Sequence, residues 1–432
     1  MKQKALLWLL ILFTLFHFVH DMAKFLRENT FIDIGHYMFY TTLVAQGGNP
    51  LNPADVDRLR ATTTYRFSIA PAHYPPFFYF YMRPLTALSF DTAKRLWLAL
   101  MTVLLFVAPV FIVANKGTRW REPETWIPWV LLLWAQPVYE DLGIGQSNIL
   151  LFFVIALACR CLTRDKSFAA GVLFAFAAMT KLHYGLFGLY YLWKRDWPVM
   201  RGIAVGGVVF GLIGLAGSSL EQNIDLIKFI SHPLPDLMQL PTNISIAGAL
   251  TRTLANESLV QVLKFVAVAA VLAPLFWVGR RKLRTSPLAD VSMVLVLIPL
   301  LSPLVEDFHL IALFITFYVL DKGGSIWRSR SRTALWILAY LIIASRFSFA
   351  NFHALPFAAQ TLLQSSKILG VVILYWLTLT DREPGSDSEP VDGRRSDLRS
   401  GGAPAVLRNS ERNRGLQFPR TLATKALSSR TF

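Results

Sequence analysis

The chain has 432 residues, of which 54% are hydrophobic, 13% are aromatic and only 16% are charged. Soluble domains carry about a quarter charged residues, and apolar runs long enough to cross a bilayer as a helix recur along this sequence. The composition excludes an ordinary soluble protein and predicts an all-α polytopic membrane protein. The formal net charge of +16 does not indicate a nucleic-acid partner, because the Lys and Arg residues form short clusters between apolar runs.

Hydropathy predicts about twelve transmembrane helices. The first run begins MKQK and lacks a small-residue cleavage site, so it is predicted to be a retained span and not a signal peptide. The segment 75–90 is apolar but short, and it carries Arg83 and Pro84, so we expect an interfacial or re-entrant piece there. The predicted spans are 5–21, 93–114, 125–139, 147–162, 168–181, 183–193, 202–218, 258–278, 288–303, 308–320, 333–348 and 366–380.

The stretch 167–193 is predicted to form two short helices that are broken at TKLHYG, because of where the basic clusters then fall. If this stretch forms two helices, all the Lys/Arg clusters lie on the same side of the membrane as the N-terminus. If it forms one helix, the last three clusters, which hold eleven cations, lie on the opposite side. Lys and Arg of short loops stay cytoplasmic, which predicts a multi-pass protein of the inner (plasma) membrane with both termini in the cytoplasm. The clusters are Lys116–Arg119–Arg121, Arg160–Arg164–Lys166, Lys194–Arg195–Arg201, Arg280–Arg281–Lys282–Arg284 and Lys322–Arg328–Arg330–Arg332.

Residues 1–380 are expected to form one transmembrane domain. Its longer loops, 22–92 and 219–257, lie on the extracytoplasmic side of this topology, and the first should carry interfacial helices. Residues 381–432 are rich in Pro, Gly, Ser and Arg, which predicts a disordered cytoplasmic tail. This tail is either a solvated segment or a contact for anionic lipid through its ten Lys and Arg residues.

The first outer loop contains FIDIGHYMFYTTLVAQGGNPLNP, in which Asp33 precedes apolar residues at helical spacing. This pattern predicts a short amphipathic helix along the outer interface, ended by the turn residues GGNPLNP. Asp33 is either the N-cap of that helix or a functional carboxylate, and position alone leaves both open. The next motif, AHYPPFFYF, is either a rigid turn or an aromatic lining for an isoprenoid chain or a sugar.

EDLGIGQSNILLFF, residues 140–153, places two acids, Gln146 and Asn148 at a helix start. Ser147 or Asn148 could simply cap that helix, and no strand precedes the glycines, which excludes a nucleotide-binding fold. Lys181 ends an apolar helix on the outer side, against the positive-inside pattern. It either extends to the interface or, as a costly ionisable residue at membrane depth, binds an anion such as a lipid-linked phosphate.

LLSPLVEDFHLIALF, residues 300–314, crowds three polar side chains into a short outer turn. Glu306, Asp307 and His309 form either a plain polar turn or a site in which the histidine is a metal ligand, a base or an orienting residue.

In this order the motifs resemble those of glycosyltransferase family 87, the polyprenyl-phosphate-mannose-dependent mannosyltransferases of the GT-C superfamily. The resemblance covers residues 1 to about 380 and implies a GT-C fold and a hexosyltransferase of class EC 2.4.1.-. The matching stretches are DIGHYMFYTTLVAQGGNPL, YPPFFYFYMRPLTALSF, GIGQSNILLFFVIALACR, AAGVLFAFAAMTKL, LLSPLVEDFHL and, more weakly, NISIAGALTR.

The resemblance implies an inverting transfer of a sugar, most often mannose, from a polyprenyl-phosphate donor to a glycolipid or polysaccharide acceptor at the extracytoplasmic face. Asp33 matches the acid that is the family's general base. The residues expected to bind the donor phosphate or lipid are Lys181, His309, Tyr74 and Gln146. The residues expected to line the pocket or contact the acceptor are His36, Tyr37, Asn148, Glu306 and Asp307.

No cofactor is expected, because phosphate is a good leaving group, although Glu306, Asp307 and His309 leave a divalent metal open. The expected partners are the lipid-linked donor, the acceptor and the bilayer, with no nucleic acid. Two alternatives from other classes remain. One is a transporter or flippase of lipid-linked sugars, which needs no base and more often shows repeated halves with broken helices. The other is a non-catalytic protein of envelope assembly.

Overall fold

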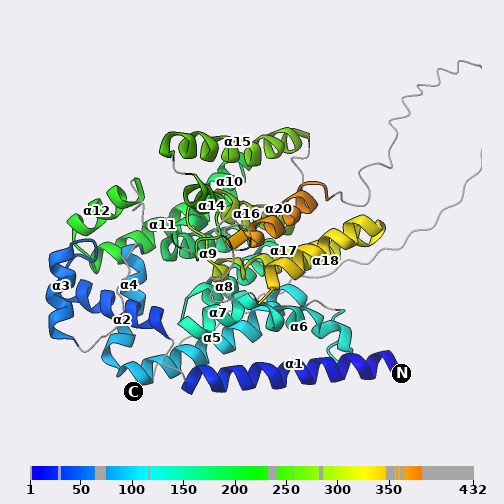
Figure 1. Cartoon of the computed structure of the whole chain (residues 1–432), viewed down its shortest axis with the longest axis horizontal. Coiled ribbons are helices and arrows are strands. Elements are labelled where there is room, and N and C mark those ends of the chain that lie inside the picture. The colour runs from blue at the N-terminus through cyan, green and yellow to red at the C-terminus, as the bar shows by residue number, and fades with distance from the viewer. Residues whose placement is uncertain are drawn as a thin grey trace, which may run out of the picture. The chain divides into compact units, whose positions relative to one another are not determined.

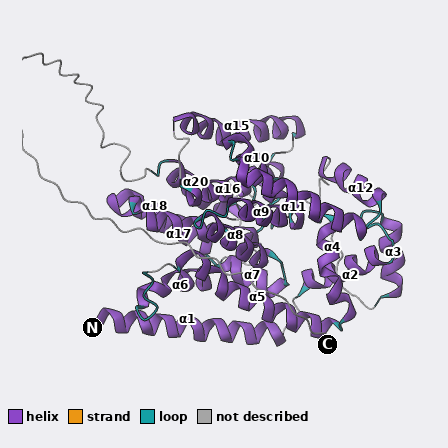
Figure 2. Ribbon diagram, turned by 180° about the vertical axis from the view of Figure 1, so that it is seen from behind, coloured by secondary structure: helices purple, strands orange, loops and turns teal. Residues whose placement is uncertain are grey.

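A computed structural model describes residues 2–27, 31–63, 74–114, 117–231, 240, 242–254, 256–281, 286–346, 356, 359–360, 363 and 365–381. These residues form 18 α-helices and five short 3₁₀ segments and contain no strand (Figures 1 and 2). The all-helical prediction is therefore confirmed for the described part of the chain. Residues 382–432 lie outside it, so the disordered tail stays a prediction.

The N-terminal elements are α1 (Lys2–Arg27), α2 (Ile32–Ala45), α3 (Pro53–Thr62), α4 (Pro76–Met82), η1 (Arg83–Ala87) and α5 (Phe90–Val113). The central elements are η2 (Pro123–Trp126), α6 (Ile127–Trp134), α7 (Gln136–Ile144), α8 (Asn148–Leu162), α9 (Ser167–Thr180), η3 (Leu182–Gly185), α10 (Leu186–Lys194) and α11 (Trp197–Ala216). The C-terminal elements are α12 (Leu220–Ser231), α14 (Ile246–Thr253), α15 (Glu257–Arg281), α16 (Pro287–Leu301), η4 (Asp307–Leu310), α17 (Leu313–Gly323), η5 (Ser325–Arg328), α18 (Arg330–Ala344) and α20 (Ser366–Leu379).

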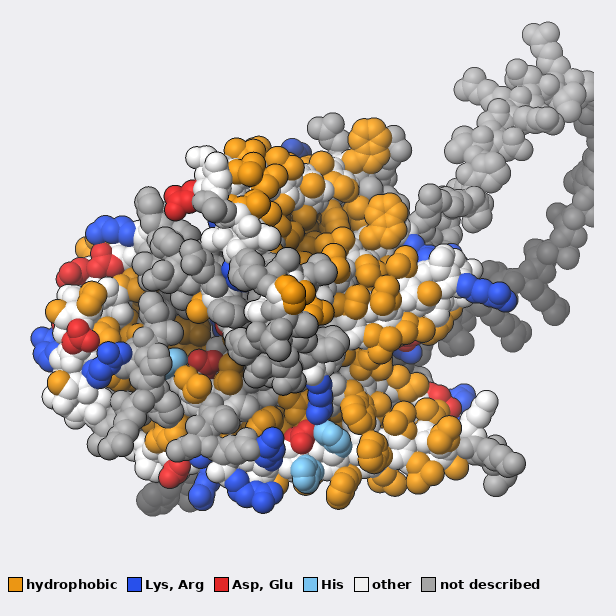
Figure 3. All heavy atoms as spheres, viewed as in Figure 1, with side chains coloured by type: hydrophobic (Ala, Val, Ile, Leu, Met, Phe, Trp, Pro, Cys, Tyr) orange, Lys and Arg blue, Asp and Glu red, His pale blue; other side chains and the backbone are white. Residues whose placement is uncertain are grey.

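Four described helices are long and apolar enough to cross a membrane, over residues 3–27, 90–113, 197–216 and 257–277. Shorter apolar helices include α8, α9, α16 and α20. Hydrophobic side chains gather on the surface over α1, α15 and α18, whereas charged side chains gather over α3 and α12 (Figure 3). An apolar surface of this extent is matched to lipid, since water would disfavour it. The chain is a multi-pass membrane protein.

The predicted span 125–139 is not one helix. Instead, α6 ends at Trp134, Ala135 is extended, and α7 begins at Gln136. Pro137 lies in the first turn of α7, where its missing N–H costs nothing; inside a continuous helix the ring would clash with the preceding turn. The break is therefore a local consequence of Pro137, and it gives α7 a direction independent of α6.

The predicted break at TKLHYG is confirmed, since η3 separates α9 from α10. Helices α9 and α11 pack closely through small residues: a Cβ on Gly171 would overlap the Val199 carbonyl, and one on Gly206 would overlap Ala175. Because later residues of α9 face later residues of α11, the two helices run parallel. The connecting α10 must therefore run in the opposite direction, as two separate helices require.

Two expectations for the first outer loop need correction. Helix α2 begins at Ile32 with Phe31 at the N-cap, so Asp33 lies within the first turn and is not the cap. The helix is also not amphipathic, because its residues from Ile34 to Val44 are buried on nearly every side. The segment 75–90 does form only short pieces, α4 and η1, as predicted. At about 1.5 Å of rise per residue, the seven residues of α4 are too few to cross a bilayer.

Candidate active site

Four segments that are distant in the sequence meet around one polar site: the first turn of α2, the loop from α7 to α8, the residue after α9, and the late turn at η4. Gly145 brings the first two together. Its φ is +79°, a conformation that favours glycine, and a Cβ there would lie 3.1 Å from Ile34 and 3.2 Å from Phe31 of the α2 start. This explains the glycine before Gln146 by backbone geometry and close packing, without any nucleotide.

Gln146 joins the carboxylate of Asp33 to the ammonium of Lys181. Its Nε2 donates to Asp33 Oδ2 at 2.7 Å, and its Oε1 accepts from the Tyr37 hydroxyl at 2.5 Å and from Lys181 Nζ at 3.0 Å. Trp97 holds the backbone of the loop by donating from Nε1 to the Gln146 carbonyl at 3.2 Å. Asp33 and Lys181 are therefore coupled through one amide and make no direct ion pair.

Asp33 is the more accessible end of this bridge. Its side chain is 19% exposed, and its Oδ1 lies 3.4 Å from His36 Nδ1. Its position in the first turn of α2 also places a negative charge where a helix macrodipole favours it. Two tyrosine hydroxyls lie near this bridge: that of Tyr37, which is buried, is 3.4 Å from that of Tyr74. Burial raises the pKa of both tyrosines, so these hydroxyls remain protonated donors.

Lys181 is buried, with 5% of its surface exposed. Its Nζ donates to Asn148 Oδ1 at 2.9 Å as well as to Gln146, and it lies 5.4 Å from the centre of the Phe308 ring. Within the described part of the chain, no carboxylate lies within 4.0 Å of it, although Asp141, Asp33 and Glu306 act on it from further away. The ammonium is thus held by neutral oxygens, and its charge is not cancelled in contact.

Asp141 is a site residue that the sequence reasoning did not select. Its carboxylate accepts from the backbone N–H of Asn148 (3.1 Å), from the Asn148 side chain (2.8 Å) and from the N–H of Ile149 (3.3 Å). Asp141 therefore caps α8, whereas the sequence analysis had considered Ser147 or Asn148 for that role. Its bond to the Asn148 side chain also orients the Asn148 oxygen toward Lys181. Burial raises the pKa of Asp141 to about 6, against these hydrogen bonds. In the sequence, the pair of acids in EDLGIGQSN was the signal that could have identified Asp141.

The late turn presents His309 to Lys181. The Glu306 N–H donates to His309 Nδ1 at 2.9 Å, which closes a capping box on η4 and assigns the proton of the neutral ring to Nε2. That Nε2 lies 3.4 Å from Lys181 Nζ. Two N–H donors at this separation cannot satisfy each other, whereas an oxygen anion beside them can accept from both.

The weak motif NISIAGALTR supports this turn. The Ile244 N–H donates to the Val305 carbonyl at 2.7 Å, and the Asn243 side chain accepts from the Val305 N–H at 3.2 Å. Thr242 donates to Glu306 Oε1 at 2.8 Å. Burial raises the pKa of Glu306 to about 7, although the bond from Thr242 acts the other way.

Asp307 turns away from this group and pairs with Lys367 at the start of α20. Both side chains are buried. Glu140 of α7 lies beside them, and burial followed by the Asp307 charge raises its pKa to about 9. Lys367 was missed in the sequence, although it is an ionisable residue in an apolar helix, the same signal that selected Lys181. In the described residues, no three His, Cys, Asp or Glu side chains are grouped as a metal ion would require.

Comparison with known families matches residues 72–303, more than half of the chain, to glycosyltransferase family 87. The chain belongs to this family. The matched region of this family 87 protein contains Tyr74, Gln146, Asn148 and Lys181, whereas Asp33 and the late turn lie outside it. No solved structure matches the chain significantly.

Curated relatives of the family 87 protein are mycobacterial. It is 29% identical over 230 residues to the polyprenol-phosphate-mannose-dependent alpha-(1-2)-phosphatidylinositol mannoside mannosyltransferase of Mycolicibacterium smegmatis, which covers 50% of this chain and 51% of the relative. It is 24% identical over 281 residues to the enzyme of the same description from Mycobacterium tuberculosis, covering 60% and 64%. A phosphatidylinositol pentamannoside mannosyltransferase of M. smegmatis is 27% identical over 214 residues, covering 48% and 50%. The chain thus spans between half and two thirds of the length of these relatives.

Proposed function

We propose that this family 87 protein is an inverting mannosyltransferase that moves mannose from a polyprenyl-phosphate donor to a glycolipid or glycan acceptor. The observation that carries the proposal is the bridge through Gln146, which joins an accessible carboxylate, Asp33, to a buried lysine whose charge is not cancelled in contact. This is the pairing that glycosyl transfer from a lipid phosphate needs: a base for the acceptor and a cation for the leaving group.

The proposed donor site lies between Lys181 and His309. A phosphate oxygen there accepts from Lys181 Nζ and from His309 Nε2–H, the two donors that lie 3.4 Å apart. As the bond between C1 of the sugar and the phosphate oxygen breaks, charge grows on that oxygen, and the two donors stabilise it. Asn148 and Gln146 hold the lysine in place from the other side.

On the acceptor side, Asp33 takes the proton of the attacking hydroxyl. The new bond joins the acceptor oxygen to C1, the electron pair of the broken bond leaves with the lipid phosphate, and the proton stays on the carboxylate. Attack opposite to the leaving group inverts the anomeric carbon. Gln146 and His36 orient the Asp33 oxygens. The curated relatives act on phosphatidylinositol mannosides, which supports a glycolipid acceptor.

The proposed setting is a GT-C fold with about twelve transmembrane helices, both termini in the cytoplasm and the site at the extracytoplasmic face. Each predicted span contains an observed helix, with the span at 125–139 divided between two. Helices α9 and α10 are counted as two spans because η3 separates them. The basic clusters then all lie on one side.

The test is transfer of radiolabelled mannose from polyprenyl-phosphate-mannose in membranes that contain the wild type or Asp33→Asn. Loss of one general base lowers transfer by about 10²- to 10⁴-fold. Asp57→Asn, an exposed acid on α3, is the matched control and should retain wild-type transfer. Transfer that survives in Asp33→Asn would remove Asp33 as the base, and a wild type without transfer would remove the donor assignment. A transporter or scaffold would tolerate Asp33→Asn.

A further inference from the structure

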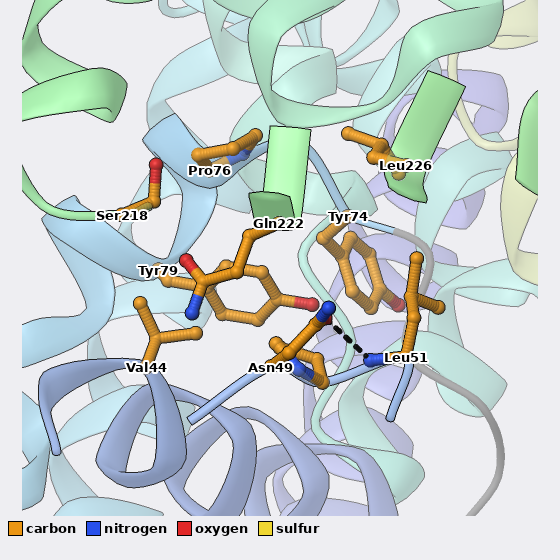
Figure 4. Close-up of a pocket in the computed structure, with 10 residues that line it drawn as sticks. Val44, Asn49, Leu51, Tyr74, Pro76, Tyr79, Ser218, Gln222 and Leu226 are labelled. Carbon is orange, nitrogen blue, oxygen red and sulfur yellow. Dashed lines mark hydrogen bonds between the residues drawn. The ribbon is translucent and has the colours of Figure 1, made fainter. Parts of the chain in front are cut away.

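Helix α12 is fastened to the turn that ends α2. Asn49 Nδ2 donates to Asp225 Oδ2 at 2.7 Å, and Gln222 Nε2 donates to the Gly48 carbonyl. Gln222 and Leu226 also line a small cavity of about 20 Å³ together with Tyr74 and Tyr79 (Figure 4). One face of α12 therefore packs against the residues next to the candidate site.

A second face of α12 is apolar and exposed. Leu220, Ile224 and Ile227 are 71%, 44% and 64% exposed, and their spacing of four and three residues places them on one side of the helix. The charged residues Glu221 and Lys228 are exposed along one edge of this stripe. Three large aliphatic side chains in a row are costly in water, since removal of apolar surface from water is favourable.

Helix α11, which precedes α12, also exposes apolar side chains. That helix is one of the four candidate membrane spans, and its exposed residues include Val205, Val208, Leu212 and Leu215. Only residues 217–219 separate α11 from α12, and three residues reach at most about 10 Å. A helix that begins so close to the end of a span begins at the membrane surface.

We propose that α12 lies in the membrane–water interface, with Leu220, Ile224 and Ile227 inserted among the lipids and Glu221 and Lys228 in water. A helix with separate apolar and charged faces is suited to this position. Because α12 is bonded to the turn after α2, the same contact sets the depth at which the α2 end and Tyr74 stand relative to the bilayer. The proposal rests on the membrane insertion of α11 and does not depend on the reaction.

The test uses a nitroxide label on the full chain in liposomes, with Cys159 and Cys161 replaced by Ala. Labels are attached through Ile227→Cys on the apolar stripe, through Glu221→Cys as the matched control, and through Val208→Cys as a reference on α11. Relaxation by lipid-soluble oxygen and by water-soluble nickel-EDDA is then compared. We expect the oxygen-to-nickel ratio at position 227 to be several times that at position 221 and lower than that at position 208, which lies near the middle of the α11 span.

A ratio at position 227 equal to that at position 221 would overturn the proposal, because both sides of the helix would then be in water. Ile224→Cys gives an independent measurement if the first variant fails to fold. Neither result bears on transfer of mannose, so failure of this proposal is distinguishable from failure of the proposed function.

Discussion

Two kinds of lysine lie inside this protein, and they differ in what surrounds the charge. Lys367 forms an ion pair with the buried carboxylate of Asp307. Lys194, the last residue of α10, likewise lies 3.0 Å from the carboxylate of Asp290. Lys181 instead donates to the amide oxygens of Gln146 and Asn148. A charge that is paired in contact has its electrostatic partner within the fold, whereas a charge held by neutral oxygens retains attraction for an anionic ligand. The difference separates a lysine that serves the fold from one suited to a substrate.

The largest effect is expected on stability, at the paired lysine. Lys367→Met leaves Asp307 buried without its cation, which should destabilise the protein by about 3–5 kcal/mol. The double variant Lys367→Met/Asp307→Asn removes both charges and should recover much of this loss. The thermal midpoint in detergent, at one scan rate, measures both. A single variant as stable as the wild type would show that the pair does not support the fold.

Lys181→Met should show the opposite pattern, with a retained fold and impaired chemistry. The change leaves only neutral amides behind, but it removes the proposed stabiliser of the leaving phosphate, so transfer should fall about 10²- to 10³-fold. Lys228→Met, an exposed lysine on α12, serves as the control. A variant that unfolds but keeps wild-type turnover in its folded fraction would place Lys181 with Lys367 among the structural lysines.

Gln146→Glu is designed to convert Lys181 from a lysine held by neutral oxygens into one that is paired with a carboxylate. It puts a carboxylate at about hydrogen-bond distance from Lys181 and should weaken use of the donor by about tenfold to a hundredfold, since charge-assisted bonds are worth about 1.5–3 kcal/mol. The KM for the lipid donor measures the effect. Gln136→Glu makes the same change on α7 outside the network and should leave that KM unchanged. An unaltered KM in Gln146→Glu would mean that the charge of Lys181 is not what binds the donor.

The smallest effect is expected from pH, through Glu306. Its pKa is raised from 4.5 to about 7 in the fold, so the folded state binds more protons between these values. Stability therefore falls as pH rises from about 4.5 to 7. Glu306 is partly exposed, which limits its share to about 1–2 kcal/mol after solvent screening. Glu306→Gln should flatten the decline in thermal midpoint between pH 5 and pH 8. If the thermal midpoint of Glu306→Gln falls equally steeply with pH, the pH dependence comes from Asp141 or Glu140, whose pKa values are also raised.

The sequence by itself determined the helical class, the presence of apolar membrane helices and the break after Lys181, and its ordered motifs indicated the family. These depend on hydropathy, proline positions and loop charge, which are local properties of the chain. The same reasoning failed for α2 because a pattern of apolar residues does not show what surrounds them: the helix is enclosed by neighbouring elements and has no exposed side.

Tertiary structure alone decided how the polar residues are joined. The bond from Gln146 to Asp33 links residues 113 positions apart, and Asp141 replaces the expected cap of α8 through a bend at Gly145. The partner of Asp307 is Lys367 of the last described helix, and that pairing separates Asp307 from the Glu306–His309 group beside it. Such contacts depend on where helices pack in space, so the sequence could name the ionisable residues but could not tell which lysine would be left without a carboxylate in contact.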